Sequence, residues 1–398
     1  MKKILIVSPC NKRRDTLGLV SGIISTFAKL DKSRYNISLF DTSFFERNHN
    51  PKDYDVDHYY GLDIHLIDGI IRLIPHFRAG YASSNAVKTF GRLLKEQKFD
   101  IVVVHQVPNY ADKLVSIAHA NGAKIVFEPF GSDVLLVSGK YKTNIEKAFE
   151  EVDGVVGRKK SNVLIAAQEV YKVPDNKIFE QREVSGGVIR LKNLRGKLSR
   201  IEMHREIGLP YSDYNIVCGY SGRKTHRHRQ IIDALIQVKD VLPEGYQIIF
   251  PMTYGAGQHH EIIINYATEL KSKCEEAGLN TIFMTDFKTF EQMTYLHLIT
   301  DLFIEIQPAD NGNAFMIEAL YAQNQIVTGR WLNYKRFEQF GNPYYLIDKP
   351  EDLAEKLREI FTGKTEKAIV PQELVDFFDV PDGYDKSEFW ANLFEKLN

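Results

Sequence analysis

The 398-residue sequence has little cysteine and no long apolar run. Its three cysteines are scattered and odd in number (Cys10, Cys218 and Cys274), so they predict neither a disulfide framework nor a metal site and fit a reducing cytosol. No segment approaches the roughly 18 consecutive apolar residues of a membrane span. The N-terminus is basic and then apolar, but the apolar run is too short for a signal peptide and predicts a first strand instead.

A strong charge of one sign is also missing. The net charge is −1, so no global field favours binding to nucleic acid. With 44% apolar and 26% charged residues, the composition is typical of a globular protein, and the length favours two domains. No Gly-x-Gly-x-x-Gly motif follows the first predicted strand, which argues against a dinucleotide-binding fingerprint.

Apolar runs alternate with amphipathic stretches along the first half of the chain. The runs are mostly continuous Val, Ile and Phe, as in strands buried on both faces of a parallel sheet. They are Lys3–Val7, Tyr35–Phe40, Ile101–His105, Lys124–Glu128 and Gly154–Val156. The stretches between them have helical periodicity, as in Val20–Lys29, Ala86–Gln97 and Tyr110–Ala120. This order predicts a doubly wound α/β domain.

A second series of the same kind begins near Tyr214. Its predicted strands are Tyr214–Gly219, Gln247–Met252, Asn280–Met284, Asp301–Ile306, Gln325–Thr328 and Tyr344–Ile347. Between the two series, Val184–Asp213 is basic and polar and is interpreted as the interdomain connection. We therefore expect an α/β protein of two Rossmann-like domains around a central cleft. Residues 1–190 and 191–375 are the predicted domains, and 376–398 is a predicted C-terminal helix that can cross back to the first domain.

The most informative stretch is Asp310–Glu318. Its two carboxylates stand eight positions apart, and the turn after the first contains Asn311, Gly312 and Asn313. A predicted strand precedes the stretch and a predicted helix follows it, which is where open α/β sheets bind ligands and where a helix N-terminus attracts a diphosphate. Glu318 lies among apolar residues, so we expect it to be partly buried and to need a partner such as a pair of sugar hydroxyls. The alternative is a helix-capping Asp310 and a solvated glutamate.

A basic loop opens the second series. The chain reads Gly219-Tyr-Ser-Gly222 after a predicted strand, and side chains that can be cationic follow at Arg223, Lys224, His226, Arg227 and His228. Glycines let a backbone approach a phosphate closely, and arginine or lysine neutralises the phosphate charge. The loop therefore predicts a phosphate site, with a solvated basic loop as the alternative.

Other candidates follow predicted strands in both domains. In the second domain, Tyr254 and Phe287 can stack on or flank a ligand, unless their loops are plain connections. In the first domain, Glu128, Asp133 and His105 are candidates for a general base or for a group that orients a hydroxyl. A lone histidine at a strand end is more often structural, so that alternative stays open for His105.

One segment of the first domain, Ile64–Arg78, mixes apolar and basic residues. This composition is typical of a segment that rests on a membrane surface. A buried segment or one that lines a crevice explains the composition equally well.

These motifs resemble those of glycosyltransferases of the GT-B architecture. Asp310 and Glu318 resemble the Glu-x7-Glu element of retaining family 4 enzymes, and Phe130-Gly131-Ser132-Asp133 resembles their His-Gly-Ser-Asp turn. Gly219–Gly222 with His226–His228, followed by Pro251–Gly255, is similar to the enterobacterial transferases of 4-acetamido-4,6-dideoxygalactose. The resemblance spans the whole chain but rests on few motifs.

The resemblance implies that the second domain binds a nucleotide sugar and the first binds an acceptor. Glu318 would bind the ribose, Asp310 the donor sugar, and Arg223, Lys224 and His226–His228 the diphosphate. The chain departs from the family twice, because Asp310 is one methylene shorter than glutamate and Phe130 replaces a histidine. GT-B enzymes stabilise the leaving diphosphate with side chains and a helix dipole, and the second domain's cleft loops contain no Asp-x-Asp motif. We therefore expect no metal and no cofactor besides the donor.

These observations predict a cytoplasmic glycosyltransferase. Any membrane contact is expected to be peripheral, at the inner face of the membrane. The enzyme would move a sugar from a nucleoside diphosphate to a glycan, lipid-linked or protein acceptor in bacterial surface polysaccharide or glycoconjugate synthesis, and would not bind nucleic acid. Two alternatives stay open. One is a non-catalytic glycan-binding or partner subunit of the same fold, and the other is a nucleotide-sugar epimerase.

Overall fold

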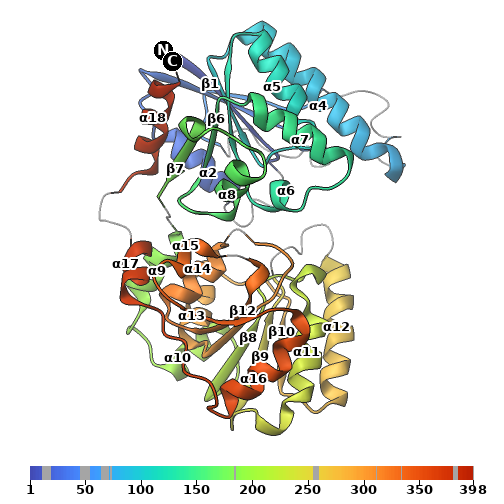
Figure 1. Cartoon of the computed structure of the whole chain (residues 1–398), viewed down its shortest axis with the longest axis vertical. Helices are drawn as coiled ribbons and strands as arrows, with labels where there is room; N and C mark the ends of the chain where they lie inside the picture. The colour runs from blue at the N-terminus through green and yellow to red at the C-terminus, as the bar shows by residue number, and fades with distance from the viewer. Residues whose placement is uncertain are drawn as a thin grey trace. The chain divides into compact units, whose positions relative to one another are not determined.

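The computed structural model describes residues 1–10, 19–44, 54–63, 71, 74–182, 185–253, 260–310, 312–332, 334–379 and 384–397. The chain divides into two compact units. Unit 1 comprises Met1–Arg182 and Gly383–Asn398, and unit 2 comprises Glu183–Asp382. Each unit is a sheet covered by helices (Figure 1). The division after Arg182 precedes residue 190, which lies inside a helix of unit 2, α9 (Gly186–Leu194).

Unit 1 is built on a seven-stranded sheet in which all neighbouring strands are parallel. In sheet order the strands are β3 (His58–Tyr60), β2 (Tyr35–Asp41), β1 (Lys2–Ser8), β4 (Ile101–His105), β5 (Lys124–Glu128), β6 (Gly154–Arg158) and β7 (Ile178–Gln181). The five predicted strands are confirmed. Strands β3 and β7 were not predicted, because these short edge strands contain no continuous apolar run.

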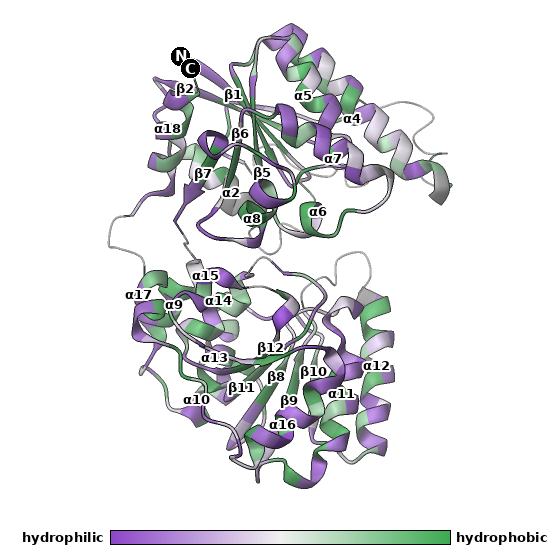
Figure 2. Ribbon diagram, viewed as in Figure 1, coloured by the Kyte–Doolittle hydropathy of each residue, from purple (hydrophilic) through white to green (hydrophobic). Residues whose placement is uncertain are grey.

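Both faces of this sheet are buried. On β4, Val102 and Val104 pack in one core and Ile101 and Val103 in the other, as the alternating side-chain directions of a strand require. One face is covered by α4 (Pro75–Gln97), α5 (Ala111–Ala120), α7 (Lys140–Glu151) and α8 (Asn162–Glu169), and the other by α2 (Leu19–Ala28) and α18 (Lys386–Lys396). Figure 2 shows the apolar strands between mixed-polarity helices. The short α6 (Ser132–Leu135) and η2 (Asp175–Lys177) lie in connections.

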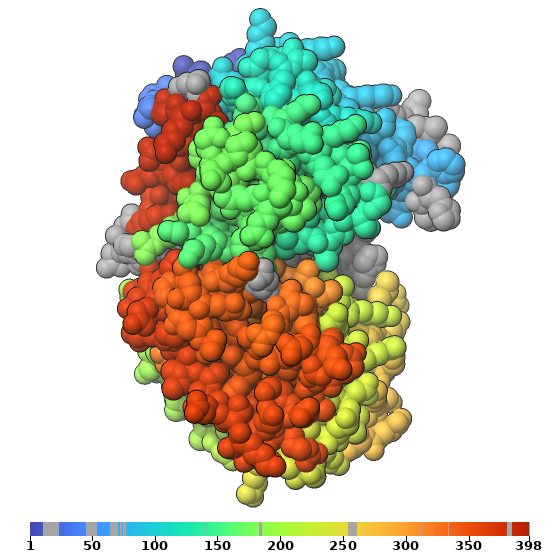
Figure 3. Space-filling model, in the orientation of Figure 1, coloured from blue at the N-terminus to red at the C-terminus, as the bar shows by residue number. Residues whose placement is uncertain are grey.

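The C-terminal helix α18 is part of the core of unit 1. Trp390 is 2% exposed, and its ring centroid lies 4.9 Å from that of Phe27 in α2. At the end of the helix, Glu395 forms ion pairs of 3.0 Å with Lys2 and with Arg34. The two ends of the chain therefore lie together on unit 1 (Figures 1 and 3).

Unit 2 is built on a six-stranded parallel sheet. Its strands are, in sheet order, β10 (Thr281–Met284), β9 (Tyr246–Pro251), β8 (Tyr214–Cys218), β11 (Leu302–Glu305), β12 (Gln325–Gly329) and β13 (Tyr345–Ile347). All six were predicted, to within two residues at each end. The helices are α9, α10 (Arg200–Ile207), η3 (Lys224–His226), α11 (His228–Gln237), η4 (Lys239–Val241), α12 (His260–Glu276), α13 (Phe290–Ile299), α14 (Ala314–Tyr321), η6 (Arg330–Leu332), α15 (Lys335–Glu338), η7 (Pro350–Asp352), α16 (Leu353–Phe361) and α17 (Gln372–Phe378).

The interpretation of Val184–Asp213 as a connection is wrong. Most of this segment forms α9 and α10, which belong to unit 2 and are capped by the side chains of Ser185 and Ser199. Basic residues such as Lys192 and Arg205 lie exposed on these helices, which is why the segment looked like a polar connection.

Side chains alternate between two cores along β11 as well. Phe303 packs in one core of unit 2, and Leu302 and Ile304 pack in the other. The alternation places Glu305 on the face of Phe303, at the carboxyl end of the strand. A carboxyl group therefore enters the core directly beneath the loop that carries Asp310.

The segment predicted to contact a membrane, Ile64–Arg78, lies partly outside the described residues. Its last residues begin α4, and of these Ile74 is 39% and Phe77 is 67% exposed. Membrane contact by this segment stays a prediction. Among the residues that the structure describes, no helix is both long and apolar enough to cross a bilayer.

Candidate functional site

The candidate site lies at the carboxyl edge of the unit 2 sheet, where the loops after β8, β11 and β12 meet. Open α/β sheets bind their ligands at this edge. The ring of Tyr220, in the basic loop after β8, stacks on Phe315 in α14 with centroids 5.7 Å apart. Phe315 in turn lies 4.1 Å from the ring of His297 in α13. These rings join the predicted basic loop to the helix that carries Glu318.

Asp310 holds the acidic loop after β11 in its shape. Its Oδ2 atom accepts hydrogen bonds from the backbone N–H groups of Gly312 (2.7 Å) and Asn313 (3.0 Å) and from the hydroxyl of Tyr334 (2.8 Å). Gly312 has a φ of +67°, a conformation that glycine adopts without strain. Asn313, rather than Asp310, caps α14, because its side chain accepts the N–H of Met316 at 2.9 Å.

The start of α15 supports this loop from the protein interior. Arg336 is 2% exposed and donates a hydrogen bond of 2.7 Å to the carbonyl oxygen of Gly312. A Cβ atom on Gly312 would lie 2.0 Å from Nη2 of Arg336, so this position has no room for a side chain. Burial, and next the charge of Asp310, raises the pKa of Tyr334 well above its ordinary value, which keeps its hydroxyl a donor. Tyr334 and Arg336 could not be predicted from the sequence, because no motif marks them.

Glu318 projects from α14 with 13% of its side chain exposed, so the predicted partial burial is confirmed. Oε1 accepts a hydrogen bond of 3.0 Å from the hydroxyl of Ser185, and Oε2 lies 3.1 Å from Nε2 of His297. His297 is 1% exposed. The carboxylate thus has protein partners on both oxygens, and a ribose partner stays a prediction. Ser185 and His297 were not predicted as site residues.

The basic loop contributes exposed cations. Arg223 and Lys224 are both exposed, and Nζ of Lys224 lies 5.4 Å from the ring centroid of Tyr266. Across the described ranges, no carboxylate lies within 4 Å of either cation. Arg227, with a φ of +56°, is half-buried, and its guanidinium lies 5.3 Å from the ring centroid of Trp331. The positive charge that faces solvent in this loop therefore comes mainly from Arg223 and Lys224.

The two histidines of the loop do not add positive charge, contrary to expectation. His226 is 3% exposed and His228 is fully buried. Burial, together with the charges of His228 and Arg223, lowers the pKa of His226 to about 3, and burial lowers the pKa of His228 to about 4. Both imidazoles are neutral at pH 7 and pack among aromatic rings.

Glu305 is a buried acid that the sequence analysis missed. It is fully buried, and its Oε1 lies 3.9 Å from Nδ1 of His226. Burial, and next the charge of Asp310, raises the pKa of Glu305 well above its ordinary value, which favours the neutral carboxylic acid. Glu305 could have been found from the sequence, because it is an acidic residue inside an otherwise apolar strand.

The remaining predicted residues of unit 2 lie in different surroundings. Gly222 packs on α12, where an added Cβ would come within 2.8 Å of Ile263, so close packing explains this glycine. Phe287 is 69% exposed in the loop after β10. Tyr254 and Asn311 lie outside the described residues.

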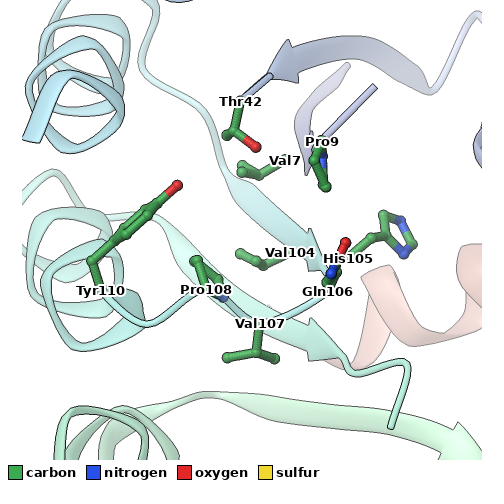
Figure 4. A pocket seen from close by; sticks show the side chains of 9 residues that line it. All are labelled: Val7, Pro9, Thr42, Val104, His105, Gln106, Val107, Pro108 and Tyr110. Atoms are coloured by element: carbon green, nitrogen blue, oxygen red, sulfur yellow. The ribbon is translucent and has the colours of Figure 1, made fainter. Parts of the chain in front are cut away.

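In unit 1, the carboxyl edge of the sheet borders a cavity of about 220 Å³ (Figure 4). Its lining comes from residues in or after β1, β2 and β4, and includes Pro9, Thr42, Gln106, Pro108 and Tyr110. His105 lies at this border but is 0% exposed, and its Nδ1 atom is 2.7 Å from Oε2 of Glu128. Burial alone would raise the pKa of Glu128, but His105, together with Lys386 and Gln181, outweighs burial and lowers the pKa to about 2. The two side chains form a buried pair.

Asp133 connects two loops of unit 1. Its carboxylate accepts backbone N–H groups of Val107 (2.8 Å), Phe130 (3.1 Å) and Gly131 (2.7 Å), which belong to the loops after β4 and β5. Burial raises the pKa of this carboxyl. The raised pKa suits a general base, while the three backbone contacts give Asp133 a positioning role in the loops.

Comparison with known proteins identifies the fold. No family model and no curated protein matches the sequence. A glycosyltransferase from Rickettsia africae is 16% identical over 100% of this chain and 98% of its own, with a TM-score of 0.67. WaaG, a glycosyltransferase of lipopolysaccharide biosynthesis, is 14% identical over 99% of both chains, with a TM-score of 0.63. HepE of Anabaena, solved with UDP and glucose, is 13% identical over 100% of this chain and 99% of its own, with a TM-score of 0.61.

The chain has the GT-B fold. The predicted fold class is therefore confirmed. Identities of this size establish the fold alone, so the roles of individual residues depend on the geometry of this chain.

The exposed cations of the basic loop give the first prediction. In the Arg223→Ala and Lys224→Ala variants, we expect affinity for a nucleoside diphosphate to fall roughly 10- to 150-fold each, because each variant loses a charged contact of about 1.5–3 kcal/mol. Affinity for the corresponding nucleoside, which lacks the phosphates, should not change. Calorimetric titration with both ligands measures the difference.

The matched control is Arg229→Ala. It removes the same charge in the following helix α11, from a guanidinium that is already paired with Glu269. This variant should retain the wild-type affinity for the diphosphate. If all three variants bind the diphosphate equally well, the loop does not bind phosphate.

The buried histidines give a prediction about pH. Between about pH 6.5 and pH 4 the unfolded chain protonates His228 and the folded protein does not, so stability must fall as the pH falls through this range. In His228→Phe this loss should shrink by up to about 3 kcal/mol. The measurement is the free energy of unfolding of the protein in denaturant at pH 7 and pH 4.5. The exposed His58→Phe serves as the control, and an unchanged pH dependence in His228→Phe would show that His228 titrates normally.

Proposed function

We propose that this protein is a glycosyltransferase that moves a sugar from a nucleoside diphosphate to an acceptor hydroxyl. The observation that carries the proposal is the arrangement at the carboxyl edge of unit 2. There a partly exposed carboxylate, Glu318, lies on a helix joined by stacked rings to a loop with two exposed cations, Arg223 and Lys224. Carboxylate, cations and strand ends are the groups that bind a ribose and a diphosphate.

The proposed chemistry assigns a role to each group. Glu318 accepts hydrogen bonds from the ribose hydroxyls, and Arg223 and Lys224 neutralise the charge that develops on the leaving diphosphate. The Nδ2 atom of Asn313 is buried and has no hydrogen-bond partner among the described residues, so it is available to donate to the donor sugar. Asp310 shapes the loop around that sugar. With cations supplied by side chains, we propose that no metal ion is required.

Two of the compared structures support the choice of substrate class. HepE was solved with UDP and glucose, and WaaG is involved in lipopolysaccharide biosynthesis. We therefore propose a nucleotide sugar as donor and a bacterial surface glycan or glycoconjugate as acceptor. In the same proposal, unit 1 binds the acceptor, with Asp133 as the candidate base and a cytoplasmic setting as expected from the sequence.

Turnover of a panel of nucleotide sugars tests the proposal. We expect hydrolysis or transfer with at least one donor, in the presence of a chelator as well as in its absence. Product analysis without an acceptor separates the alternatives, because an epimerase converts the donor sugar and releases no nucleotide. A non-catalytic subunit binds a glycan without turnover, and failure to bind any nucleotide or nucleotide sugar would reject the proposal.

The role of Glu318 makes a separate prediction. Glu318→Ala should weaken nucleoside diphosphate binding by about 1–3 kcal/mol, because the ribose loses its hydrogen-bond acceptor. Calorimetric titration measures the change. Glu373→Ala, which removes an exposed carboxylate elsewhere in unit 2, should leave the affinity at the wild-type value. Equal affinities in the two variants would exclude the ribose role.

A further inference from the structure

The start of helix α9 lies directly against the carboxylate of Glu318. Ser185 caps this helix, and its Oγ atom accepts the backbone N–H of Gly187 at 3.2 Å. The same hydroxyl donates its proton to Oε1 of Glu318 at 3.0 Å. The Ser185 side chain is therefore held by the helix backbone and in turn holds the carboxylate of Glu318, which lies 133 positions away in the sequence.

Gly187 leaves the space that the carboxylate occupies. A Cβ atom at this position would lie 1.8 Å from Oε1 and 1.9 Å from Cδ of Glu318. Gly187 lies in a helix and does not have a positive φ, so backbone conformation does not explain why glycine stands here. At Gly186, one residue earlier, the nearest atom to an added Cβ is Nη1 of Arg190 at 3.4 Å. The close approach is specific to Gly187.

His297 bounds the carboxylate on its other oxygen. Its Nε2 atom lies 3.1 Å from Oε2, and the imidazole is 1% exposed. The ring is held by Phe315, whose centroid lies 4.1 Å away. The carboxylate therefore has one fixed neighbour on each oxygen, and it lies at a helix N-terminus, where a negative charge is favoured.

We infer that Ser185, Gly187 and His297 are positioning residues that hold Glu318 ready for the ribose of the donor nucleotide. The inference rests on the proposed function and adds to it the residues that preorganise the site. A carboxylate fixed before binding loses no rotamer freedom when the ligand arrives, so its contacts contribute more fully to affinity. These residues act through Glu318 and do not touch the ligand.

A pair of neighbouring glycine variants tests this inference. Gly187→Ala should weaken binding of a nucleoside diphosphate about as much as Glu318→Ala does, roughly 5- to 150-fold, because the methyl group displaces the carboxylate. Gly186→Ala, in the same helical turn, should bind as the wild type does. Ser185→Ala should lose part of the affinity, and Ser185→Thr, which keeps the hydroxyl, should restore it. Calorimetric titration measures the affinity of all four variants for the nucleoside diphosphate.

A double variant separates positioning from general damage to the fold. If Gly187 acts through Glu318, Gly187→Ala should neither weaken binding nor lower the free energy of unfolding once Glu318→Ala has removed the side chain that it meets. Additive effects of the two substitutions on binding would overturn the inference and leave the ribose role of Glu318 intact. Failure of Glu318→Ala to weaken binding would instead overturn the ribose role, and the inference with it.

If the Gly187→Ala variant fails to fold, the double variant still tests whether Gly187 acts through Glu318. Relief of the clash predicts that the double variant folds and binds like Glu318→Ala. A double variant that fails to fold would show that Gly187 is required for reasons other than Glu318, and would overturn the inference.

Discussion

A carboxyl group can be buried in an apolar core only if it is protonated or fully hydrogen bonded, and this constraint shapes the edge of the unit 2 sheet. Three acids lie within a short stretch of chain there. Glu305 is fully buried, and burial raises its pKa well above the ordinary value, which favours the neutral acid. Asp310 is satisfied by two backbone N–H groups and the hydroxyl of Tyr334, while Glu318 is held by Ser185 and His297 and keeps 13% of its side chain exposed. Of the three, Glu318 best combines a fixed geometry with access for a ligand.

The same constraint applies to the bases around this edge. Burial makes His226 and His228 neutral, so a loop that looks strongly basic in sequence presents mainly the charges of Arg223 and Lys224. Two charges at the edge suit a diphosphate, which carries a comparable negative charge. The histidines instead pack the loop onto the sheet, where His226 lies next to the buried Glu305. Within this loop, the buried histidines therefore contribute to packing, whereas Arg223 and Lys224 face a ligand.

Much of the fold could be predicted from the sequence, because strands buried on both faces leave continuous apolar runs such as Ile101–His105. The short edge strands β3 and β7 leave no such run, and helices α9 and α10 were hidden by the basic residues on their exposed faces. Glu318 could be found because it follows a strand and a turn at a known spacing. Its partners could not, because Ser185 and His297 meet it only through tertiary packing, across 133 residues in the case of Ser185.

The most direct test of the account is a crystal structure of the protein with a bound nucleoside diphosphate sugar. The account predicts ribose hydroxyls within hydrogen-bond distance of Glu318, whose contacts with Ser185 and His297 are kept, and a diphosphate beside Arg223 and Lys224. A nucleotide bound elsewhere, or one whose ribose lies at this edge without touching Glu318, would contradict it.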